Sequence, residues 1–231
     1  MEKIKAILFD LDETIINAPV SLAAAQRVVA SEVSNFVRGR INKKEIYLKI
    51  RALDDRMNMS GRYNRHEWWP MLLAELGIKK RLPPQDTEKL TKLYWDTFTE
   101  TTKPYPDAES TLLYLKKKGY KLGLVTDTDG VDGAKRERMK RLELVKLFDV
   151  IVVGGEDTPR PKPSPEPFLL AASRLGLNPN ECAVVGDKPF TDIKGGKSAG
   201  MLTIWLKRRD WGIEEIPNMM IRSLKDLTNI F

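Results

Sequence analysis

The 231-residue chain has one cysteine, one histidine and no long uninterrupted apolar segment. The single Cys182 excludes an intramolecular disulfide, and its place in an apolar run indicates a buried, unreactive thiol. The lone His66 excludes a metal site built from several histidines. No apolar run approaches the roughly 20 residues that span a membrane, and the first residues lead into a strand without a signal peptide. We therefore expect a cytoplasmic protein with no membrane partner.

The charge balance is the second compositional feature. The chain has 39 basic and 32 acidic residues, which gives a net charge of +7. An excess of this size fits an ordinary solvated surface, and it also favours attraction to phosphorylated substrates or to nucleic acid. No motif typical of nucleic-acid-binding proteins is present. We expect a small phosphorylated metabolite as the partner, and no nucleic acid.

Hydrophobic periodicity divides the chain into two kinds of sequence. Residues 4–9 form an apolar run that predicts a buried strand, whereas apolar residues recur at helical spacing through residues 18–102. Pro104 and Pro106 mark a connector. Beyond it, helices alternate with strands that we expect at residues 121–125, 150–153, 182–185, 201–206 and 219–221.

This alternation predicts a parallel sheet that is covered by helices on both faces. The fold class is therefore α/β, with a doubly wound, Rossmann-like sheet. We expect residues 1–17 and 103–231 to form this α/β core. Residues 18–102 are expected to form an all-helical domain inserted after the first strand.

Acidic residues follow two of the predicted strands. Asp10 and Asp12 alternate with apolar residues after the first strand, so they lie on one side of an extended segment. Asp187 and Asp192 follow a later strand. Because ligands of open α/β sheets bind beyond the carboxyl ends of strands, these residues are candidates for one site; solvated acids at surface turns are the alternative. Oxygen ligands without His or Cys favour Mg²⁺, held by Asp10, Asp12 and Asp187.

A magnesium site of this kind suits phosphoryl transfer. One aspartate would attack phosphorus and form an acyl phosphate, while a carboxylate two residues on acts as acid and then as base. Thr126, directly after a strand, would bind phosphate or merely cap a helix. Lys162 would neutralise phosphoryl oxygens or be a solvated loop residue. Asp192 would orient Lys162 or a water on the metal, or only stabilise the start of its helix.

Four separated signatures resemble those of the haloacid dehalogenase (HAD) superfamily of hydrolases, in the class with a cap inserted after the first motif. They occur in the family's order and span nearly the whole expected core: Asp10-Leu11-Asp12-Glu13-Thr14, Thr126 after an apolar strand, Lys162-Pro163-x-Pro165-x-x-Phe168, and Gly186-Asp187 with Asp192 five positions on. The resemblance implies a phosphoric monoester hydrolase similar to phosphoglycolate phosphatases. The metal-free dehalogenases of the superfamily lack the second aspartate, so Asp12 favours phosphoryl transfer.

The resemblance also implies a role for each motif residue. Asp10 is the nucleophile and a magnesium ligand, and Asp12 is the acid and base whose backbone carbonyl contacts the metal. Asp187 is a metal ligand, with Asp192 in support. The phosphoryl group is bound by a second set of residues: Thr126, Asp127 through its backbone N–H, and Lys162.

The chain departs from the family pattern at two positions. Glu13 stands where many members have Gly, and Asp127 stands where Asn is common. Each adds an acidic group near the expected site, and the backbone N–H of Asp127 is still available for phosphate.

Residues 56–66 form a basic loop region that includes Arg62 and His66. This region would read the leaving group of the substrate, or be a solvated tip or a dimer contact. The protein is expected to be a monomer or a homodimer. Two alternative functions stay open: a sugar phosphomutase of the same superfamily, and a non-catalytic phosphate-binding or interaction module.

Overall fold

The structure, a computed structural model, describes residues 3–212 and 215–231. The described residues contain a six-stranded sheet in the order β3-β2-β1-β4-β5-β6, and every neighbouring pair of strands is parallel. Its strands are β1 (Ala6–Phe9), β2 (Lys121–Asp127), β3 (Val150–Gly154), β4 (Cys182–Gly186), β5 (Leu202–Leu206) and β6 (Met219–Ile221). The predicted α/β class with a parallel sheet is confirmed. The order reverses between β1 and β4, which marks the switch point of the sheet.

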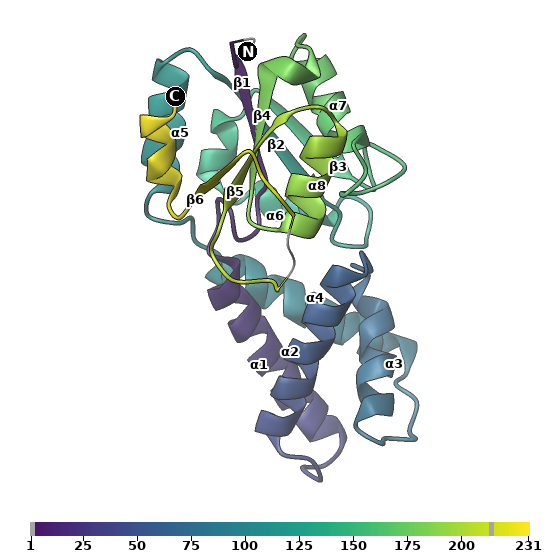
Figure 1. The fold of residues 1–231 in the computed structure, drawn as a ribbon. Coiled ribbons are helices and arrows are strands. Elements are labelled where there is room, and N and C mark those ends of the chain that lie inside the picture. Colours follow the sequence, from purple (N-terminus) through teal and green to yellow (C-terminus); the bar gives the residue numbers. More distant parts are fainter. Residues whose placement is uncertain (1–2, 213–214) are drawn as a thin grey trace. The chain divides into compact units, whose positions relative to one another are not determined.

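Helices cover both faces of this sheet. The covering elements are α5 (Ala108–Lys117), α6 (Ala134–Met139), η1 (Glu143–Leu147), α7 (Glu166–Arg174), η2 (Pro179–Glu181), η3 (Pro189–Ile193), α8 (Lys194–Ser198) and η4 (Leu224–Asn229). Helices α7 and α8 lie on one face, and α5 and η4 lie on the other (Figure 1). Because both faces are buried, the central strands are apolar throughout instead of alternating.

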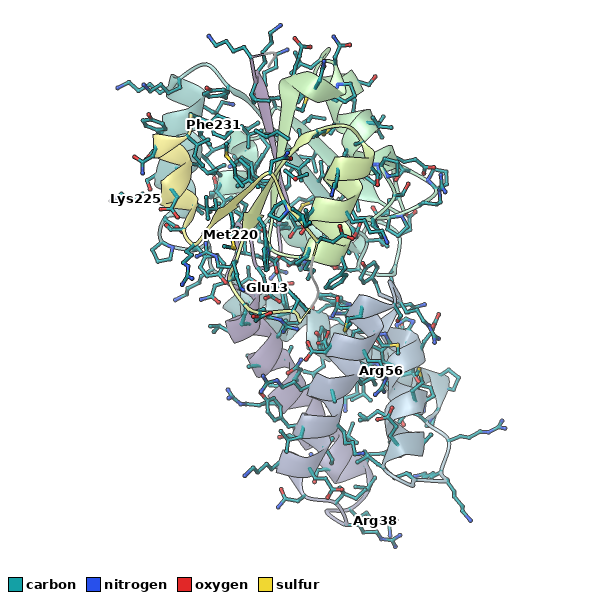
Figure 2. All side chains as sticks on the ribbon, in the orientation of Figure 1. Glu13, Arg38, Arg56, Met220, Lys225 and Phe231 are labelled. Carbon is teal, nitrogen blue, oxygen red and sulfur yellow. The ribbon has the colours of Figure 1, made fainter. Side chains whose placement is uncertain are left out.

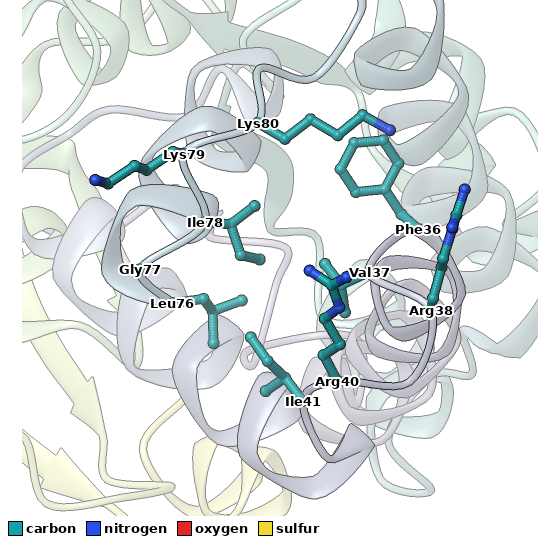
Figure 3. A pocket seen from close by; sticks show the side chains of 10 residues that line it. All are labelled: Phe36, Val37, Arg38, Arg40, Ile41, Leu76, Gly77, Ile78, Lys79 and Lys80. Atoms are coloured by element: carbon teal, nitrogen blue, oxygen red, sulfur yellow. The ribbon is translucent and has the colours of Figure 1, made fainter.

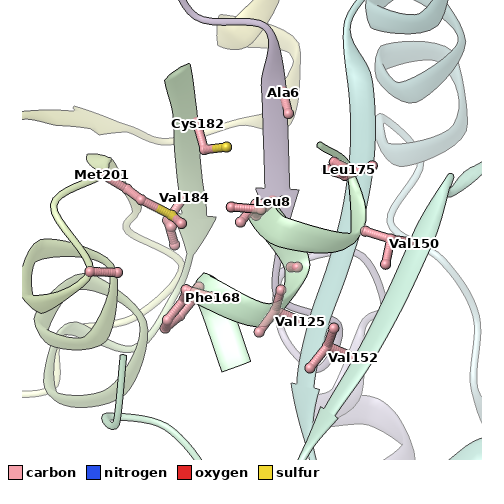
Figure 4. Close-up of a cluster of buried hydrophobic side chains, with 13 residues drawn as sticks. Ala6, Leu8, Val125, Val150, Val152, Phe168, Leu175, Cys182, Val184 and Met201 are labelled. Carbon is pink, nitrogen blue, oxygen red and sulfur yellow. The ribbon is translucent and has the colours of Figure 1, made fainter. Parts of the chain in front are cut away.

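One hydrophobic cluster fills the space between the sheet and α7 (Figure 4). Alternate residues of β1, Ala6 and Leu8, face Phe168 of α7, together with Val184 of β4. Cys182 lies in the same cluster and is a free, buried cysteine. Burial raises the pKa of its thiol to about 11, so the thiolate needed for reaction is scarce near neutral pH. The prediction that this cysteine is buried is confirmed, and its low reactivity stays a prediction.

The chain divides into two compact units. One comprises residues 1–17, 103–128 and 132–231, and contains the sheet; the other comprises residues 18–102 and 129–131. The second unit consists of the helices α1 (Ala18–Phe36), α2 (Lys43–Met59), α3 (Arg65–Glu75) and α4 (Pro84–Thr101). None of the helices that the structure describes is both long and apolar enough to cross a bilayer.

The helical unit has its own core, in which α1 packs against α2 and α4. The largest fully buried side chains are aromatic, among them Trp68, Trp69 and Tyr94. The indole N–H of Trp69 donates to Thr91 Oγ1 at 2.8 Å, so this buried donor is satisfied. Apolar burial of this kind gives the unit a core that is separate from that of the sheet.

Three elements differ in detail from the sequence prediction. Strand β2 continues through Thr126 and Asp127, whereas a strand ending at residue 125 was expected. The segment after β4 begins as a π-helical turn, η3, before α8. The last helix, η4, is a 3-10 helix. The first difference is one of strand length, and the other two are differences in helical hydrogen-bond type. Apolar spacing alone specifies neither.

Candidate active site

The register of the sheet brings the carboxyl ends of β1, β2 and β4 level with one another. Asp10 follows β1 directly, Thr126 is the next-to-last residue of β2, and Asp187 follows β4 directly. These three residues therefore lie at one edge of the sheet, at the switch point where open α/β sheets bind their ligands.

Three carboxylates converge at this edge. Asp10, Asp187 and Asp192 each offer an oxygen, and these oxygens all lie within 4.8 Å of one another. All three residues are buried. Asp192 reaches the cluster from η3, and its Oδ2 accepts a hydrogen bond from the backbone N–H of Lys188 at 3.0 Å. Asp10 of the first acidic pair and both members of the second pair are thus brought together.

Lys162 provides a positive charge in this cluster. Its Nζ donates to Asp10 Oδ1 at 2.6 Å and to Asp192 Oδ1 at 2.8 Å. A third hydrogen bond runs to the carbonyl of Val125 at 3.2 Å. All three ammonium protons are therefore used, and the side chain is only 4% exposed. Lys162 is a buried structural and electrostatic partner of the carboxylates, which excludes the solvated-loop alternative.

Burial of these charges shifts their pKa values. Burial raises the pKa of Asp10 to about 6 although Lys162 opposes the rise. Burial also raises the pKa of Asp187 well above its ordinary value, with nearby Lys188 acting in the other direction. The pKa of Lys162 is raised well above its ordinary value, because its carboxylate partners outweigh the effect of burial. Negative charge is thus in excess here, and a cation would stabilise the ionised carboxylates.

Two buried oxygens of the cluster, Asp10 Oδ2 and Asp187 Oδ2, make no hydrogen bond with any residue that the structure describes. A buried carboxylate oxygen without a partner is costly unless a metal ion or a proton satisfies it. The other oxygen of Asp187 accepts only a long hydrogen bond, from Thr14 Oγ1 at 3.4 Å. An all-oxygen, acidic donor set fits a hard divalent cation. The residues present therefore fit a metal ion of the magnesium type.

The side chain of Asp12 is directed elsewhere. Its carboxylate accepts two hydrogen bonds from the guanidinium of Arg138, at 2.9 and 3.0 Å, and one from Lys135 Nζ at 2.7 Å. Both cations belong to α6 and are buried. Although burial alone would raise the pKa of Asp12, these two cations hold it well below its ordinary value. Asp12 is therefore ionised and fixed in orientation.

Lys135, Arg138 and Lys188 were not identified from the sequence. The first two lie three positions apart on α6, so they share one face of that helix. Lys188 directly follows Asp187, and nearby carboxylates, Asp187 first, raise its pKa despite its burial. The spacing of Lys135 and Arg138 could have shown that they share a helix face. Nothing in the sequence indicated that this face lies against Asp12.

Asp127 contacts the site through its side chain. Its Oδ1 accepts the backbone N–H of Lys162 at 2.9 Å, and burial raises its pKa. The acidic residue found where Asn is common thus positions the lysine-bearing segment. The predicted contact of its backbone N–H with phosphate stays a prediction.

Gly186 lies directly against the side chain of Asp192. It lies in β4, and a Cβ atom there would lie 2.4 Å from side-chain atoms of Asp192. The absence of a side chain at this position therefore makes room for the third carboxylate.

Glu13 occupies an unusual backbone conformation (Figure 2). Its φ angle is +68°, in the left-handed region that favours glycine. The residue is buried, and its charge is among the causes of the raised pKa values of Asp187 and Lys188. The position where many superfamily members have Gly therefore keeps a glycine-like backbone.

Three arginines of the basic region at residues 56–66 have partners within the helical unit. Arg62 pairs with Glu67 at 2.7 Å, and Arg56 pairs with Glu75. Arg65 is buried, with its guanidinium 3.9 Å from the ring centroid of Trp68. Arg65 is therefore part of the core of this unit. The role of the region as a reader of the leaving group, a solvated tip or a dimer contact stays a prediction.

The fold and the site together define an α/β enzyme with an acidic, lysine-paired centre at the switch point of its sheet. The sequence matches the haloacid dehalogenase-like hydrolase family over residues 4–200. The chain belongs to this family, as the four motifs indicated.

Individual relatives agree with this assignment. A glyceraldehyde 3-phosphate phosphatase from Methanopyrus kandleri is 29% identical over 98% of this chain and 97% of its own length. A phosphoglycolate phosphatase from Salmonella paratyphi A is 29% identical over 89% of this chain and 82% of its own. Among solved structures, the HAD-hydrolase YfnB from Bacillus subtilis, bound to magnesium, is 25% identical with a TM-score of 0.75, covering 99% of both chains.

Proposed function

We propose that this protein is a magnesium-dependent phosphatase that hydrolyses small phosphate monoesters through an aspartyl-phosphate on Asp10. The main support is the state of Asp10, whose Oδ1 is fixed by Lys162 while its buried Oδ2 has no hydrogen-bond partner. Such an oxygen is oriented, poorly solvated and available for attack on an electrophile. Relatives that match over most of the chain are phosphatases, which supports phosphorus as that electrophile.

The metal would be held by Asp10, Asp187 and Asp192, with the backbone carbonyl of Asp12 as the further ligand that the family resemblance implies. The ion would neutralise negative charge on the phosphoryl oxygens. The magnesium reported for the B. subtilis relative supports the choice of ion.

Different residues of this chain would carry out different parts of the reaction. Thr126 and the backbone N–H of Asp127 would hold the phosphoryl group, and the charge of Lys162 would neutralise its oxygens. Oδ2 of Asp10 would attack phosphorus as the bond to the leaving oxygen breaks. The ionised Asp12 would take a proton from the water that cleaves the acyl phosphate, and would give that proton to the leaving oxygen of the next turnover. Atoms and charge balance, because the alcohol leaves with one proton and Asp10 is regenerated with release of phosphate.

The relatives support a class of substrate and not one particular compound. We propose a small phosphorylated metabolite, with glyceraldehyde 3-phosphate and phosphoglycolate as the first compounds to test. Residues 1–17 and 103–231 are the catalytic core of this proposal, and residues 18–102 are the cap. The cytoplasmic location and the monomeric or homodimeric state stay predictions.

The proposal is tested by phosphate release from a panel of phosphorylated metabolites, with added magnesium and with a chelator. We expect release that requires magnesium and that falls by a factor of about a thousand or more in Asp10→Asn. Asp210→Asn removes the same charge at an exposed position and should leave the rate unchanged. Equal release by Asp10→Asn and wild type would refute Asp10 as the nucleophile.

The phosphomutase alternative predicts a different product. It would convert a sugar phosphate to its isomer and release little free phosphate. Chromatography of the products from the same assay therefore separates the two functions. A non-catalytic phosphate-binding module would give neither product.

A further inference from the structure

Seven basic side chains gather at one end of the helical unit, where α1 is followed by α2 and α3 is followed by α4. They lie in residues 38–44 and 79–81, two segments without any acidic residue. We call this set the basic tip: Arg38, Arg40, Lys43, Lys44, Lys79, Lys80 and Arg81. Figure 2 labels Arg38 at this end of the unit. The chain has 39 basic and 32 acidic residues, which gives a net charge of +7. The seven positive charges of the basic tip are as many as this net charge.

Most of the unpaired basic side chains of the helical unit belong to the basic tip. All seven of its side chains are exposed, and none of them forms an ion pair within the part of the chain that the structure describes. Elsewhere in the same unit, Arg56, Arg62, Lys89 and Lys92 each pair with an acidic residue, whereas Arg27, Lys49 and Arg51 form no ion pair among the described residues. Seven of the ten unpaired lysines and arginines of the unit thus lie at this end, where they raise the local concentration of anions.

A pocket lies inside the basic tip (Figure 3). Its volume is about 600 Å³, and it is formed by the segments that follow α1 and α3. Ile41, Leu76 and Ile78 contribute aliphatic walls, and basic members of the tip, including Arg40 and Lys79, also line it. Apolar walls with basic side chains around the same cavity are typical of a small-molecule site, for which volumes of about 300–1,000 Å³ are usual.

We infer that this pocket binds a small organic anion that has an apolar body and a phosphate or carboxylate group. The aliphatic walls would cover the apolar body, and the unpaired cations would neutralise the anionic group. Neither set of residues belongs to the acidic site of the α/β unit, so the inference does not depend on the proposed phosphatase activity.

Other occupants fit these residues less well. Single-stranded nucleic acid is bound by stacking its bases on aromatic rings, but the one aromatic side chain of the pocket, Phe36, has Lys80 Nζ over its ring at 4.4 Å from the centroid. A second copy of the chain would bring seven like charges toward seven others, which opposes association.

The inference is tested by titrating the protein with anilinonaphthalene sulfonate, an anion with an apolar aromatic body whose fluorescence rises on transfer to an apolar site. The test variant is Arg40→Gln with Lys79→Gln. The matched control is Lys89→Gln with Lys92→Gln, which makes the same charge change on the same unit outside the pocket. We expect about tenfold weaker binding by the test variant and unchanged binding by the control. Tenfold corresponds to about 1.4 kcal/mol, or about 0.7 kcal/mol for each of the two cations.

Three further measurements complete the test. Ile78→Gln removes an apolar wall without changing charge and should also weaken binding, while thermal unfolding shows that each variant is folded. Octyl phosphate should displace the probe at concentrations where inorganic phosphate does not.

Equal affinities for wild type and the test variant, or equal displacement by inorganic phosphate, would overturn the inference. Tighter, strongly salt-dependent binding of a single-stranded oligonucleotide that displaces the probe would replace it with a nucleic-acid site.

Discussion

At the scale of single residues, Glu13 combines an acidic side chain with a backbone conformation suited to glycine. A non-glycine residue with φ near +68° costs roughly 1–2 kcal/mol relative to the right-handed conformation. The position therefore separates two effects, the strain of the backbone and the charge of the carboxylate, which two substitutions can distinguish.

We predict that Glu13→Gly is more stable than Glu13→Ala by about 1 kcal/mol in the free energy of unfolding. Both variants lose the same carboxylate, so their difference reports only the backbone at this position. Denaturant unfolding measures it. Equal stability of the two variants would show that the left-handed conformation is not strained here.

Arg138 acts through another residue, because its guanidinium holds the Asp12 carboxylate through two hydrogen bonds. We predict that Arg138→Gln lowers kcat about tenfold or more while KM changes little, since a misplaced acid and base slows the chemical step without weakening substrate binding. Arg138→Lys should recover only part of the rate because an ammonium group lacks the planar fork.

The matched control for this prediction is Arg136→Gln on the same short helix. Arg136 pairs with Asp157 and lies near Glu156, so its loss removes the same charge without touching Asp12. An unchanged kcat in Arg138→Gln, or an equal loss in both variants, would contradict a positioning role for Arg138.

Residues that follow strands directly could be predicted as site members, whereas their partners could not. Asp10 and Asp187 were found because a parallel sheet places the carboxyl ends of its strands at one edge. Lys135 and Arg138 were missed because their contact with Asp12 depends on where α6 begins, which apolar spacing does not determine. Asp192 was expected as support, and the structure brings its carboxylate into the same cluster as Asp10 and Asp187.

At the scale of elements, the carboxylate of Asp107 connects two helices that are distant in the chain. Asp107 stands at the N-cap position of α5, but it makes no side-chain capping hydrogen bond there. Its Oδ2 instead accepts from Ser223 Oγ at 2.7 Å and from the backbone N–H of Leu224 at 2.8 Å. The carboxylate therefore joins α5 to the start of η4, 116 residues away in the chain.

These contacts give a prediction about pH. Although partial burial opposes it, the hydrogen bond from Ser223 and the charge of Arg208 lower the pKa of Asp107 in the folded protein. A carboxylate with a lowered folded-state pKa stabilises the fold above its unfolded-state pKa, and this contribution is lost as the pH falls through the folded-state value.

We therefore predict that Asp107→Asn lowers the free energy of unfolding by about 1 kcal/mol at neutral pH, and that this difference from wild type shrinks in acid. Chemical denaturation of both proteins at several pH values measures the difference. A penalty that stays constant down to strongly acidic pH would contradict the role of the charged form.

Most elements were predictable from periodicity and turn residues. The strands were found because each is a short apolar run bounded by loop residues, and α4 because Pro84 stands at its first position. The extension of β2 to Asp127 and the π-helical start of the segment after β4 were not predictable. Both depend on tertiary contacts: Asp127 pairs with Gly154 of β3, and Asp192 of η3 lies against Gly186.

At the scale of the whole molecule, sequence positions from the first strand to the segment after β4 meet in one acidic centre. The carboxylates of Asp10, Asp187 and Asp192 lie together, and Lys162 joins two of them. Such a concentration of buried charge destabilises a fold unless it binds a cation or carries out chemistry. The family assignment and the phosphatase relatives are consistent with the second explanation.

The most direct test of the central claim is to quench the enzyme with acid during turnover of a phosphate ester and to map its peptides by mass. The account predicts the mass of one phosphoryl group on the peptide that contains Asp10, located at that residue, and no such species in Asp10→Asn. A phosphoryl group on a different residue, or phosphate release at the wild-type rate by Asp10→Asn, would contradict it.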